Sequence, residues 1–593
     1  MITLSLKQLR PRAAARWCQP RFFCAAANAE VVRSSQAGVL VLPAARTGDP
    51  KQESLGRGSV VGHGGNDYVC VFQVDKFWFA TPLTAAKTTA RWVGKSGEDS
   101  KATDPVKEVV RSLKRPTPTQ QQRLPLAEGI PTGLMAVDTL APLGRGQSLL
   151  VCGPHGSGKS MLAREILEQV LTTKQVDKAI RFRLEPATPL VSAPVQSAGA
   201  FLEMAATAEA VKETPATLLT AFFSAVAEAE RVRDSGRHAL LVLDTVAPLL
   251  DAWRLAHGWA EEELGQPIET DVVGAQRRGC FSSLLERAAS LSPSATVVGR
   301  EGSLTLLVLA ETEAMAALNT AKAGGKVSTQ SSVRTYSLED FADRREKEQT
   351  RLKNLVDRGV ALTDASLGAL GIAPPKGGEP SPEDRNKMEE AAAMRELQSL
   401  SDGQVVLDGA AAKRGEYPAL ACGATFSRFG LGSSTTAEGA EPRKHRDVRP
   451  AALQAVAAHL RTELALERDA GFRPTHTEGQ TAAESVDSAQ SARMAAVTAS
   501  LLQPPRTPML PEEMAAILLS ACSGGLDPLA REEAAKVLRG GSEGLLLKHL
   551  REAAPQVLER IAKEQKLSVE AAKELEIAVR LFVALRKAGA AGA

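Results

Sequence analysis

The chain has 593 residues, which is too long for one hydrophobic core, so several domains are expected. Its 72 Lys and Arg residues against 69 Asp and Glu give a formal net charge of +3, and this balance gives no reason to expect nucleic acid as a partner. Seven cysteines without CxxC pairing argue against a disulfide framework and a zinc site. No apolar run reaches the roughly 18 residues of a membrane span, so we expect any membrane contact to be made through partner proteins.

Residues 1–30 have the composition of a mitochondrial transit peptide. Apolar and aromatic residues alternate there with five basic ones that precede the first acid, Glu30: Lys7, Arg10, Arg12, Arg16 and Arg21. A basic amphipathic helix without acids suits import across a potential that is negative inside. The prediction is a cleaved targeting segment, and the alternative is a disordered basic tail.

Two regions follow before the longest domain. Residues 31–95 hold apolar, β-rich stretches at 38–43 and 68–74, bounded by glycine-rich turns, and these predict a small antiparallel barrel or sheet. Residues 96–122 are rich in Lys, Pro and Gln and predict a linker.

Residues 123–432 alternate between apolar strands and helical patterns. The strand LLVCG at 149–153, the helix at 161–171 and the strand HALLVLD at 238–244 predict a parallel sheet covered by helices. Within this domain, the densely charged stretch 313–400 predicts a solvated, partly disordered insertion. Residues 433–593 predict an α-helical domain, because leucine and valine residues repeat at helical spacing.

The sequence GPHGSGKS, at 153–160, matches the phosphate-binding P-loop pattern GxxxxGK[ST]. It follows an apolar strand and precedes a helix, as the pattern requires, so a glycine-rich turn without a ligand is a poor alternative. The backbone N–H groups that we expect to face a phosphate belong to Gly153, Gly156, Ser157 and Gly158. Lys159 is predicted to reach the β- and γ-phosphates of ATP or ADP, and Ser160 to coordinate Mg²⁺.

Asp244 is the predicted second magnesium-binding residue. It closes the apolar strand 239–243, where an acidic side chain has no packing reason to be, because burying an unpaired carboxylate is costly. The alternative interpretation is an Asp in a turn at the end of the strand.

Several segments around these motifs resemble the alpha subunit of the rotary, proton-translocating F-type ATP synthase. They read GRGQ before the P-loop, GRHALLVLD at 236–244, SSLLERAA at 282–289, GSLTLLVLAET at 302–312 and SDGQVVLD at 401–408. The resemblance implies an α/β fold: a RecA-like P-loop core with a parallel sheet, a small N-terminal β-barrel-like domain and a C-terminal α-helical bundle. It also implies a hetero-hexameric ring with beta and gamma subunits on the matrix side of the mitochondrial inner membrane.

Two further site residues follow from the resemblance. The segment 415–430 is similar to the alpha segment whose arginine reaches the nucleotide on the neighbouring beta subunit, which implies that role for Arg428. Without the resemblance, a surface salt bridge would be the preferred interpretation of Arg428. Glu185 ends the strand after the P-loop helix, where catalytic beta subunits have a glutamate that polarises water; because Pro186 follows, an ordinary strand-end Glu is the favoured alternative.

The resemblance implies an ATP-binding subunit whose own site is noncatalytic and regulatory. The departures from the family pattern are Gly156 and Ser157 in the P-loop, Thr245 after Asp244 and the long insertion, and they favour a divergent member or a paralogue. An autonomous hexameric RecA-like ATPase similar to the Rho helicase is the alternative, although no basic and aromatic platform for single strands is visible. A scaffold that has lost nucleotide binding is the least favoured, because the phosphate-binding pattern is complete.

Overall fold

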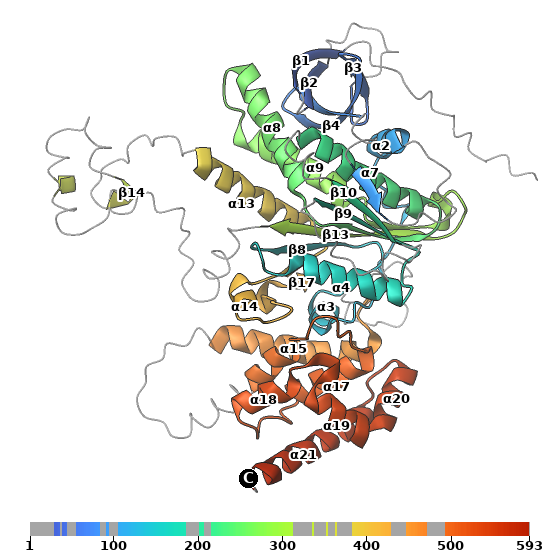
Figure 1. Ribbon diagram of the computed structural model, residues 1–593, viewed down its shortest axis with the longest axis vertical. Coiled ribbons are helices and arrows are strands. Elements are labelled where there is room, and N and C mark those ends of the chain that lie inside the picture. Colours follow the sequence, from blue (N-terminus) through green and yellow to red (C-terminus); the bar gives the residue numbers. More distant parts are fainter. Residues whose placement is uncertain are drawn as a thin grey trace, which may run out of the picture.

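The structure is a computed structural model, and its elements form three stacked parts (Figure 1). An N-terminal sheet lies at one end, a mixed sheet covered by helices lies in the middle, and a group of helices lies at the other end. The predicted fold class is confirmed. The residues that the structure describes are 29–35, 38–43, 55–83, 90–93, 105–184, 201–206, 215–311, 335–336, 351–353, 362–363, 382–428, 446–470 and 493–591.

The N-terminal sheet has five antiparallel strands in the order β1-β2-β5-β4-β3. Their bounds are β1 (Ala29–Ser35), β2 (Gly38–Pro43), β3 (Val60–His63), β4 (Asn66–Val74) and β5 (Phe77–Pro82). Both apolar stretches recognised in the sequence are therefore strands. Strand β1 begins inside the segment predicted as a transit peptide, whose residues 1–28 lie outside the described part of the chain.

Two predicted boundaries need correction. Strand β6 (Ala90–Val93) pairs with the central sheet, although the sequence placed it in the N-terminal domain. Helix α2 (Pro105–Lys114) lies within the predicted linker, and its Val109 and Leu113 are buried. The polar composition of 96–122 hid this helix, because its few apolar residues all lie on the face that packs on the central domain.

The central sheet runs in the order β17-β16-β8-β13-β11-β9-β10-β6. Strands β16, β8, β13, β11, β9 and β10 are parallel to their neighbours, and β6 and β17 are antiparallel edges. The bounds are β8 (Ser148–Gly153), β9 (Lys178–Leu184), β10 (Phe201–Ala206), β11 (His238–Leu243), β13 (Gly302–Glu311), β16 (Gly403–Val406) and β17 (Phe426–Ser427); β7 (Arg123–Leu124) and β12 (Ala289–Leu291) pair at one end.

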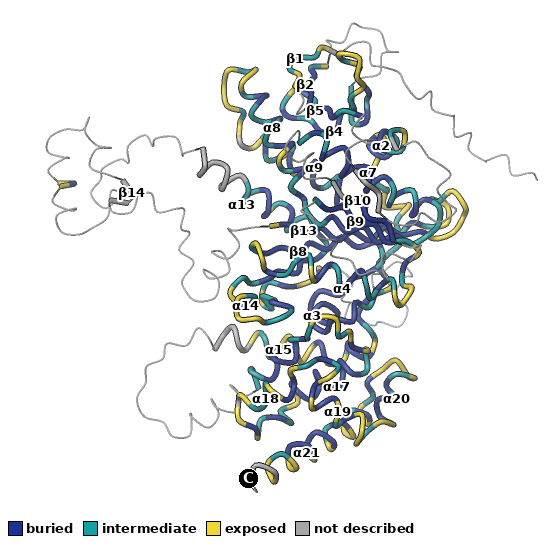
Figure 2. The backbone as a smooth tube through the Cα atoms, viewed as in Figure 1, coloured by how far each residue is buried: buried dark blue, intermediate teal, exposed yellow. Residues whose placement is uncertain are grey.

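Helices cover both faces of the central sheet, so its middle strands are buried on both sides (Figure 2). This explains why β8 and β11 are almost entirely apolar in sequence rather than alternating. Helix α4 (Lys159–Thr172) lies on one face with α3 (Met135–Leu140). On the other face, α7 (Pro215–Asp234), α8 (Ala247–Leu264) and α9 (Thr270–Leu285) form one continuous core with the N-terminal sheet.

The segment 313–400 was predicted to be a solvated, partly disordered insertion, and its last part, residues 382–400, is instead a packed helix. Helix α13 (Pro382–Leu400) packs on α9 and buries Met394 and Leu397. A bidentate ion pair joins Arg277 of α9 to Glu396 at 2.8 and 2.9 Å. Strands β14 (Thr335–Tyr336) and β15 (Leu362–Thr363) pair with each other, and most of 312–381 lies outside the described residues.

The C-terminal part is helical, as predicted. It comprises α15 (Ala451–Ala470), residues 493–500, α17 (Pro511–Cys522), α18 (Arg531–Leu538), α19 (Leu545–Ala553), α20 (Pro555–Glu564) and α21 (Val569–Ala591). Leu453, Val456 and Leu460 of α15 lie in its core. No helix within the described ranges combines the length and the apolar composition needed to cross a membrane.

Candidate functional site

The P-loop joins strand β8 to helix α4, at the edge of the sheet where the parallel strands end. Gly156 and Gly158 have φ of +72° and +94°, which residues with a Cβ rarely adopt. Gly158 precedes the first helical residue and has no side chain to cap the helix. The N–H groups at the start of α4 are therefore open to an outside acceptor, and a phosphate is the ligand that such a helix start favours.

The Lys159 side chain folds back over the loop. Its Nζ donates to the carbonyl oxygens of Gly153 and Pro154 at 2.9 and 2.7 Å. Partial burial lowers the pKa of Lys159, and the nearby carboxylates of Glu311 and Asp244 oppose that shift. An ammonium inside the loop supplies a positive charge where an anionic ligand would lie.

Ser160 and Asp244 are in contact, although 84 residues separate them. The Ser160 hydroxyl donates to Asp244 Oδ1 at 2.8 Å. Asp244 directly follows β11, and its backbone N–H donates to the carbonyl of Phe182 in β9 at 2.9 Å. The fold thus brings together the P-loop and the acid that the sequence assigned to the same site.

A buried arginine occupies the other oxygen of Asp244. Arg181 of β9 is fully buried, and its Nη2 forms an ion pair with Asp244 Oδ2. Its Nη1 lies 3.5 Å from Glu203 Oε1 in β10, and Arg183 Nε donates to the same oxygen at 2.7 Å. We call Arg181, Arg183, Glu203 and Asp244 the charge cluster.

Sequence reasoning missed three members of the charge cluster. The signal for this cluster is in the sequence AIRFRL, where Arg181 and Arg183 stand two residues apart and so share one face of an apolar strand. Glu203 then stands opposite Arg181 in the register of β10 with β9. Charged residues repeating with a period of two in a buried strand predict partners on the neighbouring strands.

The charge cluster does not fit the magnesium site predicted for Ser160 and Asp244. Magnesium is bound by carboxylate, hydroxyl and water oxygens, and anionic ligands attract it. Both carboxylate oxygens of Asp244 have protein partners here, and one of these is a permanent cation. Across the described ranges, no group of three His, Cys, Asp or Glu side chains is placed to hold a metal ion.

Arg428 lies at the end of β8 opposite to the P-loop. Ser427 pairs with Gly403 of β16, and Arg428 N donates to the carbonyl of Asp402 just before that strand, next to the start of β8, whereas the P-loop follows the end of β8. The side chain is exposed and donates to the carbonyls of Ser399 and Gln398 in the last turn of α13. The structure therefore does not bring Arg428 to this chain's own P-loop. Glu185 lies outside the described residues.

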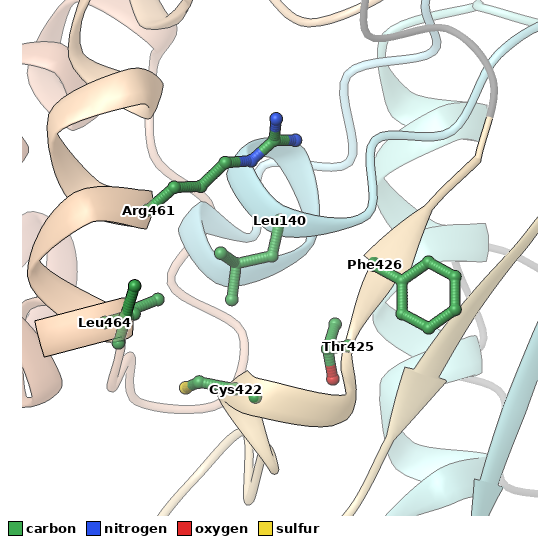
Figure 3. A pocket seen from close by; sticks show the side chains of 8 residues that line it. Leu140, Cys422, Thr425, Phe426, Arg461 and Leu464 are labelled. Atoms are coloured by element: carbon green, nitrogen blue, oxygen red, sulfur yellow. The ribbon is translucent and has the colours of Figure 1, made fainter. Parts of the chain in front are cut away.

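A cavity of about 350 Å³ lies away from the P-loop, between the central and helical parts (Figure 3). Arg461 and Leu464 extend into it from α15, Leu140 from α3, and Cys422 and Thr425 from the segment before β17. Burial, with Arg449 nearby, lowers the pKa of Arg461.

An aromatic side chain, Tyr417, lies beside the P-loop. Its Cε2 lies 3.9 Å from the place that a Cβ on Gly158 would take.

Comparison with known proteins finds relatives of the domain that holds this site. Residues 133–323 match the model of the ATP synthase alpha/beta family, nucleotide-binding domain. The chain is 31% identical over 206 residues to ATP synthase subunit alpha 2 of Gluconobacter oxydans, 32% identical over 207 residues to subunit alpha 2 of Cereibacter sphaeroides, and 30% identical over 214 residues to subunit alpha of Rickettsia canadensis. These matches cover 34% of this chain and 38%, 39% and 40% of the respective relatives.

The P-loop, the parallel sheet and the covering helices define a RecA-like nucleotide-binding domain. Within that class, residues 133–323 are similar to the nucleotide-binding domain of the ATP synthase alpha/beta family, and alpha subunits are among the proteins that resemble them. The matched region ends before Arg428, so its role remains a prediction from the short segment around it.

Proposed function

We propose that this chain binds ATP or ADP at its P-loop as an alpha-type subunit of an ATP synthase head. The observation that carries this proposal is the assembly of Lys159, Ser160 and Asp244 at one edge of the sheet inside the matched nucleotide-binding domain. The relatives whose names contain "subunit alpha" support the type of subunit. Its own site is noncatalytic in this proposal, and it regulates the ring by being occupied.

The decisive test of nucleotide binding is an ATP titration of the purified chain by isothermal calorimetry. Lys159→Ala removes the ammonium from the P-loop, so we expect ATP affinity to fall by about 100-fold, because charge-assisted bonds to phosphate are lost. Lys174→Ala is the control, since Lys174 lies beyond the end of α4 and away from the loop. Equal binding by wild type and Lys159→Ala would overturn the proposal.

We further propose that the chain assembles with beta and gamma subunits in a hetero-hexameric ring. Arg428 supports this arrangement, because an exposed arginine remote from its own P-loop is free to serve a neighbouring site. Native mass spectrometry of the complexes that contain this chain is the test. We expect to detect complexes that contain this chain together with beta and gamma subunits. Detection of the chain only as a homo-oligomer would contradict the ring and favour the autonomous ATPase.

In the proposed ring, the P-loop of this chain binds nucleotide without hydrolysing it, and Arg428 contributes to hydrolysis at the site of a neighbouring subunit. In a reconstituted ring, Arg428→Ala should slow ATP hydrolysis by at least about 100-fold, since arginine fingers in other NTPases contribute that much or more. ATP binding by the isolated chain should remain unchanged. If the isolated chain hydrolyses ATP and Arg428→Ala abolishes that activity, the noncatalytic role is wrong.

The proposed place of action is the matrix side of the mitochondrial inner membrane. The basic, acid-free segment that precedes Glu30 supports it. A fluorescent protein carrying residues 1–30 should be imported into mitochondria, and a variant with its five basic residues changed to Gln should not be. A cytosolic signal from the unaltered fusion would contradict the targeting proposal.

A further inference from the structure

The charge cluster holds two cations and two anions with almost no access to water, and one of them, Asp244, contacts Ser160 of the P-loop. The side chains of Arg181 and Glu203 are 0% and 1% exposed, and those of Asp244 and Arg183 are 7% and 9% exposed. The four formal charges cancel. Because desolvating each charge is costly, such a cluster needs a reason beyond filling the core.

The contacts of Arg181 show which of the two carboxylates is its main ion-pair partner. In the strand register, Arg181 stands opposite Glu203, yet its ion pair with Asp244 is closer than its 3.5 Å contact with Glu203. Glu203 instead takes its hydrogen bond from Arg183. Arg181 Nε makes no hydrogen bond to the rest of the described structure, so the guanidinium is not arranged to satisfy all its donors. Arg181 is therefore directed at Asp244, the acid beside the P-loop serine.

This pairing changes the electrostatics of the phosphate site. A carboxylate and a hydroxyl at these positions attract a divalent cation only while the carboxylate charge is uncompensated. The guanidinium cancels that charge, repels a second cation, and is always protonated. An anionic phosphate next to this neutral pair meets no uncompensated carboxylate, and removing that repulsion is one effect that a bound metal ion would have.

We infer that Arg181 replaces the divalent cation at this P-loop, so that the site binds ATP or ADP free of metal. Lys159 and the backbone N–H groups then hold the phosphates directly, with Arg181 and Asp244 as a neutral pair behind them. The claim rests on the nucleotide binding proposed above, and it adds the chemical form of the ligand. Its test must therefore separate loss of metal dependence from loss of binding.

The experiment measures ATP affinity of the full chain by calorimetry in excess Mg²⁺ and again in EDTA. For the wild type we expect binding in EDTA to be at least as tight as in excess Mg²⁺, because the metal finds no uncompensated carboxylate at the site and draws free ATP into its own complex. Binding that requires Mg²⁺ would overturn the inference while leaving the proposed function intact. Absence of binding in both conditions would overturn both.

A matched pair of variants tests Arg181 itself. Arg181→Gln with Glu203→Gln removes one cation and one anion, so the cluster stays neutral while the Asp244 carboxylate is released. This double variant should bind ATP at least about tenfold more tightly with Mg²⁺ than with EDTA. Glu203→Gln alone keeps the Arg181 and Asp244 pair, and should bind ATP no more tightly with Mg²⁺ than with EDTA.

Circular dichroism and a thermal melt show whether the double variant is folded. If it is folded and still binds ATP equally with and without Mg²⁺, Arg181 does not replace the cation and the inference fails. If it does not fold, the wild-type comparison between Mg²⁺ and EDTA decides the inference alone. Either result of that comparison is informative, since metal-dependent binding contradicts the inference and metal-independent binding supports it.

Discussion

The middle and the edge of the central sheet use arginine in opposite ways. In the middle, Arg181 is fully buried and neutralises the acid beside this chain's own P-loop. At the edge, Arg428 is exposed, and backbone carbonyls at the end of a helix hold it. A buried arginine can act only on the site that encloses it, whereas an exposed one is available to another protein. Burial therefore separates the residue that tunes this chain's nucleotide site from the residue proposed to serve a neighbour.

The largest effect that tests this comparison is expected from Asp244→Asn. The substitution leaves Arg181 and Arg183 with only Glu203 as a buried counter-charge, and breaking a buried pair in this way costs about 3 to 5 kcal/mol of unfolding free energy. Urea unfolding followed by tryptophan fluorescence, to which the buried Trp253 of α8 contributes, measures the loss.

The double variant Asp244→Asn with Arg181→Gln gives the control for that prediction. It leaves the Arg183 and Glu203 pair balanced, so it should be more stable than Asp244→Asn alone. If both variants lose the same stability, the ion pair with Arg181 has no energetic role and the contrast between the middle and the edge is lost.

Asp138 sharpens the comparison, because it is a buried carboxylate whose hydrogen-bond donors are neutral. It accepts bonds from Thr132 N, Thr132 Oγ1 and Gly133 N, yet burial raises its pKa to about 6. A pKa that is higher in the folded state than in the unfolded chain favours folding below about pH 4, and this contribution is lost as pH rises through about 6.

Asp138→Asn should therefore show a flatter dependence of stability on pH. Between about pH 4 and pH 7 the wild type should lose roughly 3 kcal/mol relative to the variant, as the buried carboxyl ionises. The variant also loses acceptors for the bonds from Thr132 and Gly133, so only the difference in slope carries the test. Parallel curves from urea unfolding at a series of pH values would show that Asp138 keeps one protonation state throughout.

The sequence predicted the parts of the site that a local motif encodes. The P-loop needs only eight consecutive residues, and Asp244 is marked by the apolar strand before it, so both could be recognised without the fold. The ion pair of Arg181 with Asp244 depends instead on which strands are neighbours, because β9 and β11 pair although 53 residues lie between the end of one and the start of the other. No pattern along the chain specifies that pairing.

The same distinction explains the corrected parts of the fold. Helices α2 and α13 lie in polar, charged stretches and bury only a narrow apolar stripe, such as Met394 and Leu397 in α13. Composition averages over such a stripe, so both segments resembled solvated chain. Helical spacing in the C-terminal region also does not show where one helix ends: Leu550 lies in α19 and Val557 in α20, with Pro555 starting the second helix.

The smallest expected effect is that of Arg428→Ala on the isolated chain. The side chain is exposed and its hydrogen bonds go to carbonyls at the end of α13, so its loss should cost less than about 1 kcal/mol of stability. ATP affinity should match that of the wild type, because β16 and the length of β8 separate Arg428 from the P-loop. Arg428→Lys serves as the control that keeps the charge. We expect both variants and the wild type to have the same melting temperature and the same ATP affinity. A large loss of stability or of ATP affinity would show that Arg428 acts within its own chain, and the contrast between a buried arginine for its own site and an exposed one for a neighbour would then be wrong.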